Sequence, residues 1–441
     1  MTEEKQLSGV PGRRQHARLM NGWHPGRGRR SRVPGLLRGI GPELVSAASD
    51  NDPTNVGTAA AVGAQTGYQL SWVALLIAPL LGIVLTIAAQ VGAVARDDLQ
   101  SLTVKRYGRG VAAVLLVSVV VVNLVTIAAD LQAGAAGIGL LAGVGSGWLV
   151  APLGAAVAGL LLAGRYGQVV AVLRYLMLGF AAFGAAAVLA HPDWPRLLQA
   201  SLVPALSLSR DQVVGGLALL GTTLTSYVYV WETIGRGVEE PPDRTADGGG
   251  LARARAGAVV GAVFTAVILW CMLVASAATL GRHHQAATSA QDAAGALRPL
   301  AGSAAAGLFA AGLITSAVVA LPVLMATTAH VVGAHFDWRR GLSEGIGRAR
   351  GFYAVLVASI GLALAVTLAG IPVVGMLVAA SVIGGLGTPI GLVILVRLAR
   401  DPRVMGPRPI SRRLAIAGWA VTVIVGGFGL LAILGAAVGT F

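Results

Sequence analysis

Long apolar runs separated by short polar segments fill the sequence from about residue 43 to its end. A membrane-spanning helix needs about 20 consecutive, mostly apolar residues, and eleven runs approach or exceed this length. The predicted spans cover residues 43–66, 69–95, 110–142, 147–164, 168–190, 211–235, 252–280, 301–334, 352–370, 372–397 and 413–439. The pattern therefore predicts an all-α polytopic membrane protein with about 11 transmembrane helices.

Polar residues interrupt the first and the sixth predicted spans. Residues 49–55 read SDNDPTN, and Pro53 cannot donate a backbone hydrogen bond, so the helix should open there. Residues 221–227 read GTTLTSY, which taken alone also fits a small-residue packing surface between helices. Two interrupted helices at corresponding positions of two halves are typical of inverted-repeat transporters. We therefore predict a five-plus-five inverted repeat of the LeuT-like type.

The repeats set the expected domain organisation. Residues 39–441 form the transmembrane domain, with repeat one at about 41–190, repeat two at about 205–398 and an extra helix at about 413–439. Residues 1–38 hold nine Lys and Arg among Gly and Pro and lack an apolar core of signal-peptide length. We expect this segment to be a disordered, basic cytoplasmic tail.

Composition agrees with a membrane protein. The 441 residues are 55% hydrophobic and 12% charged, against about 25% charged residues in a soluble domain. The net charge of +14 comes from basic residues between the apolar runs, which argues for a membrane partner and against nucleic acid. The single cysteine, Cys271, supports neither a disulfide framework nor a metal cluster, and we expect it to be buried.

The distribution of Lys and Arg predicts the orientation. With the N-terminus inside, 28 of the 33 Lys and Arg residues fall in inner segments and four fall outside. The positive-inside rule then places the N-terminus in the cytoplasm of a bacterial cell and, with eleven spans, the C-terminus outside the cytoplasmic (inner) membrane. His330 and His335, near the inner end of the eighth span, are expected at the membrane interface.

Several motifs in order resemble the NRAMP family of divalent-metal transporters, and in particular its NRAMP-related, magnesium-type bacterial branch. Residues 41–55 match the first-helix pattern G-P-x-x-[LIV]…D-P-G-N, with Thr54 in place of the glycine. Residues 127–131 (IAADL) resemble the aspartate motif of the third helix, and residues 221–223 with 238–240 resemble the sixth helix and its exit. The resemblance runs from about Gly41 to Gly406.

The chain departs from the family pattern at residues that matter for chemistry. Thr225-Ser226-Tyr227 stand where the family's sixth helix reads M-P-H, so the methionine sulfur ligand is absent. Further replacements fall at positions that carry protonatable or polar groups in the family: Glu232 for a second histidine, Ala133 for an acidic residue and Gly387 for a glutamine. Most of the proton relay is therefore missing.

The resemblance implies a metal site built only from oxygen atoms. Its ligands would be the Asp52 carboxylate, the Asn55 amide oxygen, the Thr225 hydroxyl and the freed carbonyls of Ser49 and Thr222. Hard oxygen ligands suit Mg²⁺, Mn²⁺ and Ca²⁺, whereas thioether and imidazole ligands favour softer metals. We therefore predict transport of divalent cations by alternating access, with Mg²⁺ favoured and Mn²⁺ possible, weakly coupled or uncoupled to protons.

Four other polar residues are candidates for supporting or coupling roles. Asp50 is either a second ligand or a cap of the broken helix. Asp130 is either a proton or gate residue or a hydrogen-bonded structural carboxylate. Glu232 pairs either with Asp130 or, one turn later on its own helix, with Arg236. Tyr227 occupies the place of the family's histidine.

Three alternative functions stay open at the level of sequence. They are a proton-coupled importer of Mn²⁺ or Fe²⁺, an organic-cation transporter of the same fold, and a membrane metal sensor that does not transport. No Walker motif, H-E-x-x-H or nucleophile elbow is present, so we expect no enzyme. We expect a divalent metal as substrate, the lipid bilayer as surroundings and no cofactor; the sequence does not give an oligomeric state.

Overall fold

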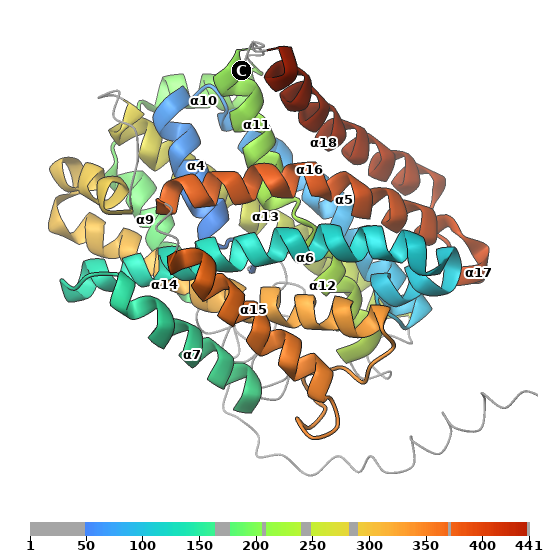
Figure 1. Ribbon diagram of the computed structural model, residues 1–441. Coiled ribbons are helices and arrows are strands. Elements are labelled where there is room, and N and C mark those ends of the chain that lie inside the picture. The colour runs from blue at the N-terminus through green and yellow to red at the C-terminus, as the bar shows by residue number, and fades with distance from the viewer. Residues whose placement is uncertain are drawn as a thin grey trace, which may run out of the picture. The chain divides into compact units, whose positions relative to one another are not determined.

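Helices make up the regular secondary structure of the described residues, as the apolar pattern predicts. The computed structural model describes residues 49–163, 177–204, 209–239, 248–281, 290–368 and 372–438 (Figure 1). Eight helices in these ranges are long and apolar enough to cross a membrane, counting the interrupted Arg210–Glu239 as one. The helices are α4 (Pro53–Thr66), α5 (Ser71–Ala95), α6 (Leu99–Ala142), α7 (Gly147–Ala163), α9 (Ala181–Leu189), α10 (Trp194–Leu202), α11 (Arg210–Thr223), α12 (Ser226–Ile234), α13 (Gly248–Thr279), α14 (Ala290–His335), α15 (Arg350–Leu368), α16 (Val373–Arg400), α17 (Pro402–Met405) and α18 (Arg412–Val438).

The eleven predicted spans correspond to these helices in order. Three of these spans correspond to shorter helices. The second half of the first span is α4, the fourth span is the 17-residue α7, and the fifth is α9 together with the 3₁₀ turn Met177–Phe180. The predicted tail, residues 1–38, and the start of the first span lie outside the described residues. Every apolar run in the described ranges is thus a helix of the protein.

The first interruption lies where Pro53 predicts it. Asp50, Asn51 and Asp52 have no helical assignment, and α4 begins at Pro53. Proline is well suited to this first helical position, because its missing N–H would have no partner there. Asp52 is the N-cap: its carboxylate accepts a hydrogen bond from the Asn55 backbone N–H at 2.6 Å.

The second interruption separates α11 from α12. Leu224 and Thr225 leave the helix, and Thr225 has extended backbone angles (φ −55°, ψ 142°). Near the end of α11, the backbone of Gly221 packs directly on α16. A Cβ atom at Gly221 would lie 2.3 Å from the Ser381 carbonyl oxygen. The two helices therefore approach as closely as only glycine permits.

The helix α6 begins earlier than predicted, at Leu99 instead of residue 110. Its first turn is capped by Asp98, whose side chain accepts from the Ser101 N–H at 2.8 Å. The backbone then leaves helical geometry at Gly108 (φ 83°, ψ 171°), in a conformation that L-residues rarely adopt. Residues 99–107 are therefore a separate polar segment that precedes the apolar span.

Most of the helices form two packed groups, and α4 and α12, which follow the two interruptions, are both in one of them. One group consists of α4, α5, α12 and α13, in which α13 packs on α4 and α5, and α12 packs on α5. The other consists of α6, α7, α14 and α15, in which α14 and α15 both pack along α6. We call them the first group and the second group. The cysteine of α13, Cys271, is buried, as predicted.

The remaining long helices, α16 and α18, pack against each other and against α11 (Figure 1). Arg106 in the first segment of α6 forms an ion pair with Asp401, which lies just beyond the end of α16. This guanidinium holds the pKa of the Asp401 carboxyl below its usual value. The ion pair thus fastens one end of α16 to the beginning of α6.

Candidate metal site

The two helix interruptions face each other, and Tyr227 joins them. The Tyr227 hydroxyl lies 2.8 Å from the Ser49 carbonyl oxygen and 3.0 Å from Asp52 Oδ2, close enough to donate to either. All three residues are at most 1% exposed. A polar hydrogen therefore stands between two of the oxygens that the sequence predicts as metal ligands.

A second contact joins the interruptions through Asn55. Its amide oxygen accepts a hydrogen bond from the Thr223 hydroxyl at 3.1 Å, and its amide nitrogen donates to the Asp50 carbonyl oxygen at 2.9 Å. The amide is therefore held in one orientation, with its oxygen toward α11. The amide oxygen that the resemblance implies as a metal ligand therefore faces the second interruption.

The Thr225 side chain turns back onto the end of α11. Its hydroxyl lies 2.6 Å from the Thr222 carbonyl oxygen and 2.8 Å from the Gly221 carbonyl oxygen. Two predicted ligands, the Thr225 hydroxyl and the Thr222 carbonyl, are thus hydrogen-bonded to each other. An sp² carbonyl oxygen has a second lone pair and a hydroxyl has two, so acceptor capacity is left on both.

Asp130 approaches the first interruption from α6. Its Oδ1 accepts two hydrogen bonds from Thr54, one from the backbone N–H at 2.9 Å and one from the hydroxyl at 2.6 Å. Asp130 is fully buried, and its Oδ2 has no hydrogen-bond partner among the described residues. Both interpretations of Asp130, as a proton or gate residue and as a structural carboxylate, therefore stay open. The contact fastens α4, in the first group, to α6, in the second.

Asp50 is not a helix cap. Its side chain is fully buried, and neither carboxylate oxygen has a hydrogen-bond partner within the part of the chain that the structure describes. The capping role belongs instead to Asp52. A buried carboxylate without a hydrogen bond is energetically costly unless a cation or a proton satisfies it.

Glu232 lies away from these residues, on the second turn of α12. Its carboxylate forms a buried ion pair with Arg236 at 3.2 Å, and both side chains are less than 10% exposed. This is the one-turn pairing along the helix that the sequence offered as one of two alternatives. The structure therefore brings together Ser49, Asp52, Asn55 and Tyr227, with Thr222, Thr225 and Asp130 around them, but not Glu232.

The donor atoms at the interruptions are all oxygens. They are carboxylate, amide, hydroxyl and backbone carbonyl oxygens, the set that hard divalent cations prefer. No group of three or more His, Cys, Asp or Glu side chains is arranged to hold a metal within the described ranges. A cation at this place would therefore be bound by a mixture of side-chain and backbone oxygens. The site predicted from the sequence has the same mixture.

A family model described as natural resistance-associated macrophage protein-like (Nramp) matches residues 43–435, which include every residue of this arrangement. The chain belongs to the Nramp family. The resemblance seen in its motifs is thereby confirmed, while the assignment to the magnesium-type branch stays a prediction.

Individual relatives agree with this Nramp membership. The divalent metal cation transporter MntH of Mycobacterium tuberculosis (strain ATCC 25618 / H37Rv) is 26% identical over 409 residues, which cover 88% of this chain and 89% of the relative. The protein of the same name from Deinococcus radiodurans is 27% identical over 401 residues, with 88% of each chain covered. Both alignments extend over most of the Nramp domain.

Solved structures match the fold at lower identity. The Eremococcus coleocola manganese transporter, in complex with an aromatic bis-isothiourea substituted compound, superposes with a TM-score of 0.69 at 19% identity, covering 92% of this chain and 89% of that one. Mhp1, a nucleobase-cation-symport-1 family transporter in a closed conformation, gives a TM-score of 0.59 at 13% identity, with 88% and 90% covered. The predicted five-plus-five transporter fold is confirmed.

Two residues of the arrangement were missed in the sequence analysis. Thr223 holds the Asn55 amide, and Thr54 holds Asp130. A signal for Thr54 was present, because it replaces the glycine of the family's D-P-G-N pattern and adds a hydroxyl next to the predicted ligand. Thr223 gave no comparable signal, since one threonine within a polar run looks like its neighbours.

Proposed function

We propose that this Nramp protein transports divalent metal cations across the cytoplasmic membrane by alternating access of its two helix groups. One observation carries the proposal: the two helix interruptions meet inside the protein, where Asp52 contacts Tyr227 and Asn55 contacts Thr223. Unwound backbone at membrane depth is tolerated only where it is buried in protein or lines a cavity. The relatives' name, divalent metal cation transporter, supports the same conclusion.

The oxygen-only donor set supports hard cations as substrates. Mg²⁺ dehydrates reluctantly and usually keeps several waters, so a site with small hydroxyl side chains such as Thr225 suits it. Mn²⁺ also accepts oxygen ligands, and the structurally similar Eremococcus coleocola protein is a manganese transporter. We propose that the protein accepts both ions, prefers Mg²⁺ and transports iron more slowly.

The driving force in this proposal is the membrane potential. The chain has Glu232 and Ala133 where the family pattern carries protonatable relay residues, and Glu232 is occupied by its ion pair with Arg236. An inside-negative potential contributes about 2.3 kcal/mol per charge per 100 mV, hence about 4.6 kcal/mol for a dication. Cation entry through the Nramp domain then needs no proton.

Uptake into proteoliposomes tests both parts of the proposal. Purified protein should give saturable uptake of Mn²⁺ and Mg²⁺ that responds to an imposed potential, and Asp52→Ala should abolish it. Faster iron transport with no magnesium flux would overturn the proposed selectivity, and uptake that follows a pH gradient but ignores the potential would overturn the proposed driving force.

Calorimetry on the same preparations separates transport from sensing. Saturable metal binding together with flux supports a carrier. Binding without flux in the parent protein would contradict transport and favour the metal sensor. Asn55→Ala should weaken binding, and Thr225→Met should shift preference toward Cd²⁺ because a thioether is a soft ligand.

A further inference from the structure

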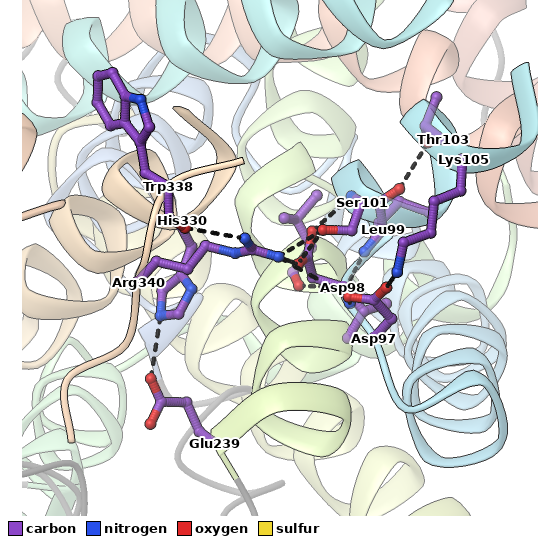
Figure 2. A network of polar contacts seen from close by, with 12 residues as sticks. Asp97, Asp98, Leu99, Ser101, Thr103, Lys105, Glu239, His330, Trp338 and Arg340 are labelled. Carbon is purple, nitrogen blue, oxygen red and sulfur yellow. Dashed lines mark hydrogen bonds and ion pairs between the residues drawn. The ribbon is translucent and has the colours of Figure 1, made fainter. Parts of the chain in front are cut away.

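At the end of the sixth span, the Glu239 carboxylate ties the chain to the second group. After α12 the chain continues through the π-helical turn Gly235–Glu239, whose last residue, Glu239, approaches α14. Glu239 Oε1 lies 3.1 Å from His330 Nε2 (Figure 2). The same oxygen accepts a hydrogen bond from the Leu342 backbone N–H at 2.9 Å. The side chains of Glu239 and His330 are only 3% and 0% exposed. His330 is thus buried inside the protein, and its place at the depth of the membrane interface stays a prediction.

The segment that receives Glu239 is itself anchored. Arg340, two residues before Leu342, donates to Asp98 Oδ2 at 2.8 Å and to the Ser101 hydroxyl at 2.6 Å (Figure 2). Asp98 is the N-cap of α6, so the connection between α14 and α15 is fastened to the second group at two places. Glu239 therefore binds to a fixed partner.

The contact of Glu239 crosses from one helix group to the other. Glu239 continues the helix that begins at Ser226, in the first group, whereas His330 and Leu342 belong to α14 and its following connection, in the second group. Alternating access in this fold is largely a rigid movement of one bundle against the other. A bond between the groups must then break in the half-cycle in which that end opens.

The position of Glu239 identifies which end it closes. Thr225, at the candidate metal site, lies 14 residues earlier on the same helix, which corresponds to roughly 20 Å at 1.5 Å per residue. Arg236, Arg339, Arg340 and Arg348 all lie near this end of the chain's spans, and the positive-inside rule assigns such an end to the cytoplasm. Glu239 is thus on the proposed cytoplasmic side of the site.

We propose that Glu239, held by His330 and the Leu342 N–H, is the latch that closes the cytoplasmic exit of the transport path. The inference rests on the proposed transport function. In it, His330 and the Leu342 N–H position the Glu239 carboxylate. A polar latch suits this task, because water replaces its hydrogen bonds when the exit opens. An apolar contact of equal area has no such replacement in water.

Reversible cross-linking tests the latch. In a Cys271→Ser background, Glu239→Cys is combined with Ser343→Cys, since the exposed Ser343 side chain lies beside the Glu239 carboxylate. A short bifunctional thiol reagent then joins the two groups in proteoliposomes. We expect Mn²⁺ uptake to fall at least tenfold on cross-linking and to recover on reduction. Uptake that is equal before and after cross-linking would show a permanent structural tie and overturn the proposal.

A matched pair of cysteines controls for the reagent. Ser343→Cys with Arg348→Cys places both thiols in the same connection, so cross-linking there joins no helix groups and should leave Mn²⁺ uptake unchanged. Equal inhibition in both pairs would contradict the latch. Calorimetry with Mn²⁺ distinguishes failure of the latch from failure of the proposed transport function. If the parent protein and the reduced double-cysteine variant neither bind nor take up Mn²⁺, the transport function is the proposal that fails.

Hydrogen exchange on the full chain with Glu239→Gln gives a second measurement that does not depend on cysteines. The latch predicts faster exchange, by tenfold or more, at Leu342 and along residues 226–239, with α13 unchanged. Glu344→Gln makes the same charge change in the connection that contains Leu342 and should have no such effect. Exchange that is unaltered by Glu239→Gln would overturn the proposal.

Discussion

Tyr227 defines the candidate site at the scale of single residues. Tyr227 follows the second interruption, and its hydroxyl lies within hydrogen-bond distance of two oxygens at the first interruption, the Asp52 carboxylate oxygen and the Ser49 carbonyl oxygen. A bound cation and this hydroxyl hydrogen compete for the same lone pairs. The tyrosine therefore holds the two interruptions together when no metal is there to do so.

Tyr227→Phe should strengthen metal binding. The substitution removes a donor whose net hydrogen bonds contribute about 0.5–1.5 kcal/mol each, so we expect the Kd for Mn²⁺ to fall by roughly threefold to tenfold. Calorimetry on purified protein measures it. A weaker affinity would mean that the phenolic oxygen is itself a ligand.

Thr54→Val should destabilise the protein by more than Thr58→Val. The first substitution leaves the buried Asp130 carboxylate without one of its donors, which costs about 1–3 kcal/mol. The second removes a bond between two hydroxyls, Thr58 and Ser381, at 2.7 Å, and should cost about 1 kcal/mol or less. Thermal unfolding of both variants in the same detergent compares them, and equal losses would contradict a special role for Thr54.

At the scale of elements, the contact of α11 with α16 fixes the second interruption. Leu224 and Thr225 can leave the helix because Gly221, one turn earlier, lies against the α16 backbone. The Thr388 hydroxyl of α16 lies 3.1 Å from the Leu224 carbonyl oxygen that the break exposes. The break is thus satisfied by a neighbouring helix and needs no proline.

Gly221→Ala should disrupt this contact. The new methyl group would lie 2.3 Å from the Ser381 carbonyl oxygen and 2.5 Å from the Gly385 nitrogen, so the helices must separate. We expect a loss of about 1–3 kcal/mol in stability and weaker metal binding. Gly361→Ala in α15 is the control, because its Cβ would meet open space, and it should be neutral or slightly stabilising. Comparable melting temperatures of the two variants would contradict this interpretation.

The same elements show what the sequence predicts and what it does not. The break at Pro53 follows from local chemistry, since proline cannot continue a helix from the preceding turn. The break at Thr225 was predicted only to lie within residues 221–227, because this run has no proline to mark where the helix ends. The early start of α6 has a local cause, the N-cap Asp98 directly before Leu99, whereas the burial of His330 depends on Glu239, which lies 91 positions away in the sequence.

At the scale of the whole molecule, the distribution of basic residues predicts the orientation of the protein in the membrane. A reporter that is active only outside the cytoplasm should be active when fused after residue 441 and inactive when fused within the connection between α14 and α15. Conversely, a thiol in that connection should react with an impermeant reagent only after the membrane is opened. If both fusions report the same side of the membrane, the predicted odd number of spans between that connection and residue 441 is contradicted.

The partners of the first interruption come from far along the chain. Tyr227 follows Asp52 by 175 positions and Thr223 follows Asn55 by 168, and at about 5–20 residues per second of synthesis the ribosome needs roughly 9–35 s to cover that distance. The α16 backbone that supports Gly221 is made later still. During biosynthesis, therefore, residues 50–55 enter the membrane before the distant groups that hydrogen-bond to them, and until those arrive, water or the insertion machinery must take their place.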